Sequence, residues 1–129
     1  NMGDVYDLQN YLELNTPPRR MECFDISHIQ GAETVASMVV FQDGSPDKSS
    51  YRRFKLQTTE GKPDDFLSMQ EVTLRRYSKC ENLPDLIVID GGLGQLSSAL
   101  SIIRGLGHQD VAVVGLAKQL RSCCQILQL

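Results

Sequence analysis

Acidic residues stand at three places where the sequence passes into or out of a regular element. Asp25 lies within a strand-like run at 21–28, Asp90 ends an apolar run at 85–90, and Asp64 and Asp65 precede an amphipathic segment. Carboxylates brought together from separate segments repel one another, and a hard divalent cation such as Mg²⁺ or Mn²⁺ relieves that repulsion. Such an ion can polarise a phosphodiester and activate a water molecule. If the fold brings Asp25 and Asp90 together, the sequence predicts phosphoryl-transfer chemistry.

The run that contains Asp25, "MECFDISHIQG", has the alternation of a strand. Phe24 and Ile26 would point to one face of this strand. Cys23, Asp25 and Ser27 would point to the other. Because a carboxylate is costly to desolvate in an apolar run, we expect a basic side chain or a metal ion beside Asp25.

The hydrophobic periodicity predicts a short N-terminal helix followed by the order βββαβαβ. The expected elements are a helix over 4–14, a strand over 21–28, two strands within 33–59 around the turn at 44–47, a helix from 66 to about 80, a strand over 85–90, a helix from about 96 that Gly105 and Gly107 end, and a strand over 111–118. This is the order of a ribonuclease-H-like mixed α/β sheet. In that topology the first and fourth strands are central neighbours, so the carboxylates of Asp25 and Asp90 should converge.

The length and composition predict a single domain. A chain of 129 residues, 41% of them hydrophobic, suffices for one core. We divide it into an N-terminal helix and linker (1–20), the ribonuclease-H-like domain (21–118) and a divergent C-terminal tail (119–129). The four cysteines show neither zinc-ligand spacing nor a disulfide framework, and no apolar run approaches the length of a membrane span. We therefore expect a cytoplasmic protein with no membrane partner.

The net charge of −3 argues against broad electrostatic attraction to nucleic acid. Any such binding must come from the local arginine pairs, which stand at 19–20, 52–53 and 75–76. Such pairs are most often solvated surface. Arg52 and Arg53 have the best claim to DNA, because one of two adjacent strand residues must face the same side as the acidic site.

Four segments resemble, in order and spacing, the C-terminal nuclease half of UvrC, the C subunit of the bacterial UvrABC excinuclease. They are "RRMECFDISHIQGAETVASMVVF", "YRRFK", "PDDFLSMQEVTLRRYSK" and "LPDLIVIDGGLGQLSSAL". The resemblance implies a domain that makes the incision 5′ of a lesion in damaged double-stranded DNA, with UvrB and UvrA-type subunits as partners. It also implies that Asp25 and Asp90 are metal-binding catalytic residues and that Asp65 is a further functional acid.

The chain departs from this family in two respects. Leu93 replaces a lysine in the family's "DGGKGQL". The family continues past "GLAK" into a segment with a catalytic histidine and then into helix-hairpin-helix motifs, whereas the residues after Lys118 here, "QLRSCCQILQL", do not align. Neither His28 nor His108 occupies the place of that histidine. We therefore expect residues 1–129 to bind metal but to cleave DNA poorly.

Each of these residues also has a purely structural interpretation. Asp64 or Asp65 could be the N-cap of the helix that follows, and Asp90 could simply end its strand. His28 shares a face with Phe24, which favours a hydrogen-bonded core histidine over a ligand. The functional hypotheses are a metal-dependent endonuclease, a non-catalytic binding module derived from one, and, less well supported, a nucleotide-binding module that uses "DGGLG" but leaves Asp25 unexplained.

Overall fold

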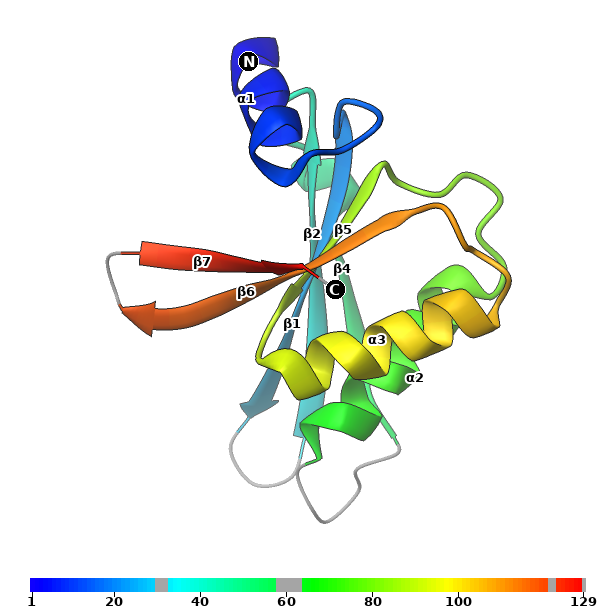
Figure 1. The fold of residues 1–129 in the computed structure, drawn as a ribbon. Coiled ribbons are helices and arrows are strands. Elements are labelled where there is room, and N and C mark those ends of the chain that lie inside the picture. Colours follow the sequence, from blue (N-terminus) through cyan, green and yellow to red (C-terminus); the bar gives the residue numbers. More distant parts are fainter. Residues whose placement is uncertain (30–32, 58–63, 121–122, 129) are drawn as a thin grey trace.

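We describe a computed structural model of residues 1–29, 33–57, 64–120 and 123–128 (Figure 1). Its elements are α1 (Met2–Leu12), β1 (Arg20–Ile29), β2 (Glu33–Gln42), β3 (Ser45–Pro46), the 3₁₀ turn η1 (Lys48–Ser50), β4 (Arg52–Lys55), α2 (Asp65–Tyr77), β5 (Leu86–Asp90), α3 (Leu93–Gly105), β6 (Ala112–Leu120) and β7 (Cys123–Gln128). The predicted order βββαβαβ is present in β1, β2, β4, α2, β5, α3 and β6. Among the described residues, none of the helices is both long and apolar enough to span a bilayer.

The strands form one mixed sheet in the order β3-β2-β1-β5-β6-β7, and β4 also pairs with β2. The β1–β2 and β2–β4 pairs are antiparallel, while β1–β5 and β5–β6 are parallel. The first and fourth main strands are thus neighbours, as the sequence predicted. The ribonuclease-H-like fold class is confirmed.

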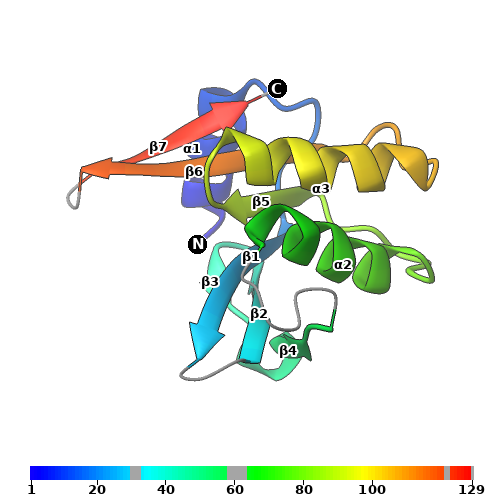
Figure 2. The same ribbon diagram turned by 90° about the horizontal axis from the view of Figure 1, so that it is seen from below.

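Helices α2 and α3 lie side by side on one face of the sheet (Figure 2). We call this the helix face. The main core fills the space between it and the helices, and includes Phe24, Met38, Ile87 and Ile89 from the strands and Met69 from α2. Because successive strand residues point to opposite faces, Phe24 and Ile26 lie on the helix face, as their alternation predicted.

A second, smaller core covers part of the opposite face, which we call the acidic face. It combines Leu12 of α1 with Leu86, Val88 and Val114, and Cys23 packs against it. Helix α1 therefore covers one end of this face (Figure 1).

The C-terminal strands run across the domain boundary that the sequence suggested at 118. Strand β6 extends to Leu120, and β7 pairs with it in antiparallel orientation within the segment 119–129. The division of the chain into 1–20, 21–118 and 119–129 remains a prediction.

Candidate active site

Asp25 and Asp90 are direct neighbours across the parallel pair of β1 and β5. Adjacent strands lie about 4.8 Å apart, and side chains paired in this way project to the same face of a sheet. That face is the acidic face, because Cys23 and Val88, two residues earlier on each strand, pack in the smaller core. Asp25 is exposed and Asp90 is half-buried. The arrangement of the two carboxylates is therefore set by strand register.

The expectation that Asp25 is a desolvated carboxylate is wrong. Asp25 lies beyond the smaller core, in the middle of β1 (Arg20–Ile29), and it is exposed. The fully buried carboxylate of this strand is Glu22, three residues earlier. Cationic side chains meet this buried charge of Glu22.

Glu22 accepts hydrogen bonds from three side chains. Arg76 donates from Nε and Nη2 over 3.1 and 2.8 Å, Tyr77 Oη donates over 2.8 Å, and Arg20 Nε donates over 3.0 Å. Burial by itself raises the pKa of Glu22, but these hydrogen bonds and the charge of Arg76 outweigh burial and leave the pKa below its ordinary value. These hydrogen bonds connect the C-terminal turn of α2, which contains Arg76 and Tyr77, to β1, the strand that carries Asp25.

Cys23 lies two residues before Asp25 on β1, and the negative charge of Asp90 affects its pKa. Burial, and then the negative charges of Asp90 and Glu22, raise the pKa of this thiol to about 12. A thiol with so high a pKa is a poor nucleophile near neutral pH.

The structure separates the roles of Asp64 and Asp65. Asp64 is the N-cap of α2, and its Oδ1 accepts the backbone N–H groups of Phe66 and Leu67, each over 3.1 Å. Asp65 is the first residue of the helix, and its side chain is 47% exposed. The N-cap interpretation thus holds for Asp64, and the carboxylate of Asp65 is directed elsewhere.

Asp65 contacts His28. The Nε2 atom of His28 lies 2.7 Å from Asp65 Oδ1, and its Nδ1 atom lies 3.1 Å from Thr34 Oγ1. The side chain of His28 is 38% exposed, so the expected core histidine is wrong, although the ring is hydrogen-bonded and shares the face of Phe24 as expected. Strand β1 continues beyond the main core at this point. The pairing with Asp65 was missed because the two residues are 37 positions apart.

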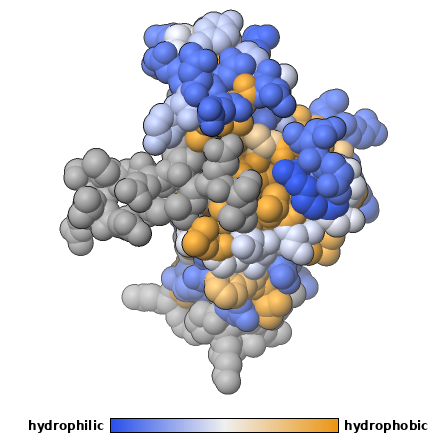
Figure 3. Space-filling view, in the orientation of Figure 1, coloured by the Kyte–Doolittle hydropathy of each residue, from blue (hydrophilic) through white to orange (hydrophobic). Residues whose placement is uncertain are grey.

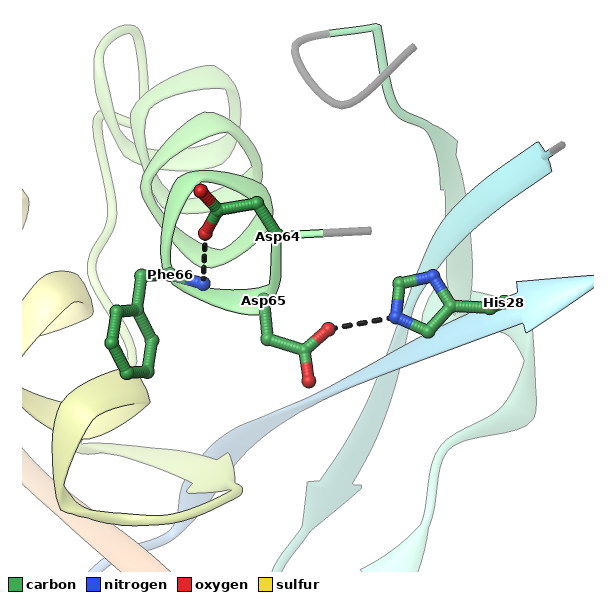
Figure 4. Close-up of a pocket in the computed structure, with 4 residues that line it drawn as sticks. All are labelled: His28, Asp64, Asp65 and Phe66. Carbon is green, nitrogen blue, oxygen red and sulfur yellow. Dashed lines mark hydrogen bonds and ion pairs between the residues drawn. The ribbon is translucent and has the colours of Figure 1, made fainter. Parts of the chain in front are cut away.

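His28, Asp64, Asp65 and Phe66 line an open pocket of about 420 Å³ (Figure 4). Figure 4 shows the Asp65 carboxylate turned toward His28 and the Phe66 ring turned toward α3. Phe66 is 55% exposed, and a Cβ atom added to Gly94 of α3 would collide with its ring. The first turns of α2 and α3 therefore meet at a close contact, from which the Phe66 ring would have to move if Gly94 carried a side chain. Apolar side chains are visible over this edge in Figure 3.

Arg53 shares the acidic face, and Arg52 does not. Arg53 pairs with Ser37, which in turn pairs with Asp25, so the three side chains form one row across the sheet. Arg53 is two strand spacings from Asp25, or about 10 Å. Arg52 pairs with Met38, a main-core residue, and therefore belongs to the helix face. Both arginines are exposed, and Arg52 donates to the carbonyl oxygens of Ser49 and Tyr51.

The donor set on the acidic face suits a hard divalent cation. Among the described residues, no three His, Cys, Asp or Glu side chains gather closely enough to enclose an ion, so the protein offers the pair Asp25 and Asp90. Mg²⁺ usually binds proteins through one or two carboxylates and completes its octahedron with water and substrate phosphate. Two carboxylates side by side on adjacent strands, Asp90 at the end of β5 and Asp25 within β1, fit that pattern. Asp65 lies with His28 at the pocket of α2.

The mixed sheet and its pair of neighbouring aspartates define a ribonuclease-H-like domain. The chain belongs to the family of UvrC RNAse H endonuclease domains, which it matches over residues 9–126. It is 53% identical over 124 residues to the UvrABC system protein C of Gloeobacter violaceus, covering 90% of this chain and 20% of that protein. It is 54% identical over 113 residues to the same protein of Bdellovibrio bacteriovorus, covering 87% and 18%. The chain thus spans about a fifth of the length of these curated relatives.

Solved structures of endonuclease V have a similar fold. The Ciona intestinalis enzyme in complex with inosine-containing DNA superposes with a TM-score of 0.51 at 18% identity, over 79% of this chain and 47% of that one. The human enzyme gives a TM-score of 0.51 at 18% identity, over 93% and 60%. At this level of identity the likeness concerns the fold alone.

Proposed function

We propose that this domain is a metal-dependent DNA endonuclease that makes the 5′ incision of nucleotide excision repair within a UvrABC-type excinuclease. The observation that carries the proposal is the register of β1 and β5, which places Asp25 beside Asp90. Membership of the UvrC endonuclease family supports the assignment to excision repair. The proposed substrate is damaged double-stranded DNA, and the proposed partners are UvrB and UvrA-type subunits in the cytoplasm.

In this proposal Asp25 and Asp90 hold Mg²⁺ or Mn²⁺ on the acidic face. A bound ion would supply Lewis-acid chemistry at the scissile phosphate. Asp65, at the N-terminus of α2, is a further catalytic carboxylate. Arg53, in the same row of side chains as Asp25, contacts a neighbouring phosphate of the DNA backbone. Arg52, which we also expected to contact DNA, points to the helix face and contributes less.

The resembled family uses a histidine from a segment that follows position 118, and proton transfer in the reaction depends on such a group. Loss of a general acid or base commonly costs about 10² to 10⁴ in rate. His108 cannot replace it, since its Nε2 atom lies 3.0 Å from the carbonyl oxygen of Tyr77, in the turn between α3 and β6. We therefore expect residues 1–129 in isolation to cleave DNA slowly.

The test replaces the corresponding segment of the Gloeobacter violaceus protein with residues 9–126 of this chain. With UvrA and UvrB, the swapped protein should incise a lesion-bearing duplex 5′ of the lesion in the presence of Mg²⁺ or Mn²⁺. The Asp90→Asn variant should lose this incision. If the swapped protein does not incise, or if incision persists in Asp90→Asn, the proposal is wrong. DNA binding without Asp90-dependent cleavage would favour a non-catalytic binding module.

A further inference from the structure

His28, Thr34 and Asp65 form a chain of hydrogen bonds that the proposed reaction does not yet use. We propose that His28 is a positioning residue. It orients the carboxylate of Asp65 and fixes the position of that carboxylate relative to β1, the strand that carries Asp25. The inference rests on the proposed endonuclease function. It deepens that function by assigning a role to a side chain that contacts Asp65.

Thr34 fixes the imidazole of His28. The two residues are paired directly across the antiparallel strands β1 and β2, and Thr34 is only 5% exposed. A β-branched side chain on a strand has few rotamers, so the position of its hydroxyl is well defined. The 3.1 Å contact from Thr34 Oγ1 to His28 Nδ1 therefore anchors the ring to the sheet.

The two hydrogen bonds select one tautomer of a neutral imidazole. An ionised Asp65 can only accept, so the 2.7 Å contact requires His28 to donate from Nε2–H. Nδ1 then has no proton and accepts from the Thr34 hydroxyl. The Nε2–H group of His28 thus donates to Asp65 from a ring that Thr34 holds in place.

The neighbouring Asp64 cannot share this role, because its carboxylate caps the helix. Asp64 therefore locates the first turn of α2, and His28 orients the side chain of Asp65. Figure 4 shows one oxygen of Asp65 toward His28 and the other turned away from it. The imidazole holds Oδ1 and leaves Oδ2 for the reacting groups.

A role in global stability does not account for this pair. His28 and Asp65 are 38% and 47% exposed, and even a fully charged pair with such exposure would contribute little to folding. The positions of His28 and Asp65 in the fold favour a role in orienting the Asp65 carboxylate instead. His28 follows Asp25 by three residues on β1, so the hydrogen bond ties the helix that carries Asp65 to the strand that carries the metal-binding residue.

The test measures steady-state incision by the swapped protein with His28→Phe, His28→Gln and a matched control, His108→Gln. We expect His28→Phe to lower kcat about 10- to 100-fold, the usual cost of losing a residue that orients a catalytic ligand, with KM for DNA unchanged. His28→Gln should recover much of the rate, because its amide can donate to Asp65. His108→Gln should match the parent.

A double variant tests whether His28 acts through Asp65. Asp65→Asn combined with His28→Phe should be no slower than Asp65→Asn alone, because residues that act as a unit are not additive. The inference would be overturned if kcat of His28→Phe were unchanged or increased, or if only its KM changed. It would also be overturned if Asp65→Asn were fully active, or if the losses in kcat of the two single variants were additive in the double variant. If Asp90→Asn is inactive while His28→Phe is fully active, only the role of His28 fails and the endonuclease function stands.

Discussion

Asp25 and Asp90 are paired residue against residue in the parallel register of β1 and β5, and both side chains project to the acidic face. Asp25 is exposed and Asp90 is half-buried, so the ion that we propose there would have room for water and substrate. This relationship distinguishes the acidic face from the helix face, where α2 and α3 cover the sheet.

The first prediction concerns metal binding. Mn²⁺ should raise the thermal midpoint of the 129-residue chain, because only the folded sheet brings Asp25 and Asp90 together. At 100 times the dissociation constant the gain is about 2.7 kcal/mol. The Asp25→Asn, Asp90→Asn double variant should lose the shift, whereas Asp110→Asn, which removes an exposed carboxylate before β6, should keep it. Equal shifts in all three proteins would refute the site.

The second prediction separates Arg53 from Arg52 in DNA binding. Arg53→Ala should weaken binding of duplex DNA and reduce the slope of log affinity against log salt by about one, the effect of losing one phosphate contact. Arg52→Ala, the matched control on the helix face, should change the slope less. Fluorescence anisotropy over a range of salt concentrations measures both. Equal slopes for the two variants would show that the row through Asp25 does not guide the DNA.

The third prediction concerns the buried Glu22. Glu22→Gln leaves Arg76 without its charged partner, so the free energy of unfolding at pH 7 should fall by about 3 to 5 kcal/mol. Because the pKa of Glu22 is lowered in the folded protein, its contribution is present above the ordinary value of 4.5 and is lost as the pH falls through the folded value. Urea unfolding should therefore show the parent and Glu22→Gln converging in acid. Glu81→Gln, an exposed control, should follow the parent at every pH.

The fourth prediction concerns the contact between α2 and α3. Gly94→Ala should lower the free energy of unfolding by about 1 to 3 kcal/mol, because the new methyl group collides with the Phe66 ring. Gly105→Ala, in the same helix with open space around it, should be neutral or stabilising. Adding Phe66→Leu should relieve the effect of Gly94→Ala. No difference between the two glycine variants would mean that the ring moves aside without cost.

Periodicity predicted the order of elements and the faces of β1, because both depend on local spacing. Phe24 and Ile26 lie on the helix face for the same reason that they alternate with Asp25 in the sequence. The pairing of Asp25 with Asp90 followed once that order indicated which strands are neighbours.

Burial along β1 could not be predicted in the same way. Alternation says which face a side chain occupies, but it does not say where a core ends. On the acidic face the smaller core ends before Asp25, and on the helix face the main core ends before His28. Both residues are exposed, whereas Glu22 is fully buried. Arg76 and Tyr77, the partners that make this burial tolerable, are 54 and 55 positions away in the chain. No local pattern connects them.

The parallel pairing of β1 with β5 also has a consequence for the order of folding. Asp25 and Asp90 are 65 positions apart (90 − 25), and their strands can pair only after a loop containing β2, β4 and α2 has closed. Non-local pairings of this kind form late, because the entropy of loop closure is lost before the contacts are gained. The β1–β2 hairpin can form without β5, and it then contains Asp25 but not the neighbouring Asp90. High-affinity metal uptake should therefore lag behind hairpin formation in a refolding experiment, and its time course would report when the central pair of strands is complete.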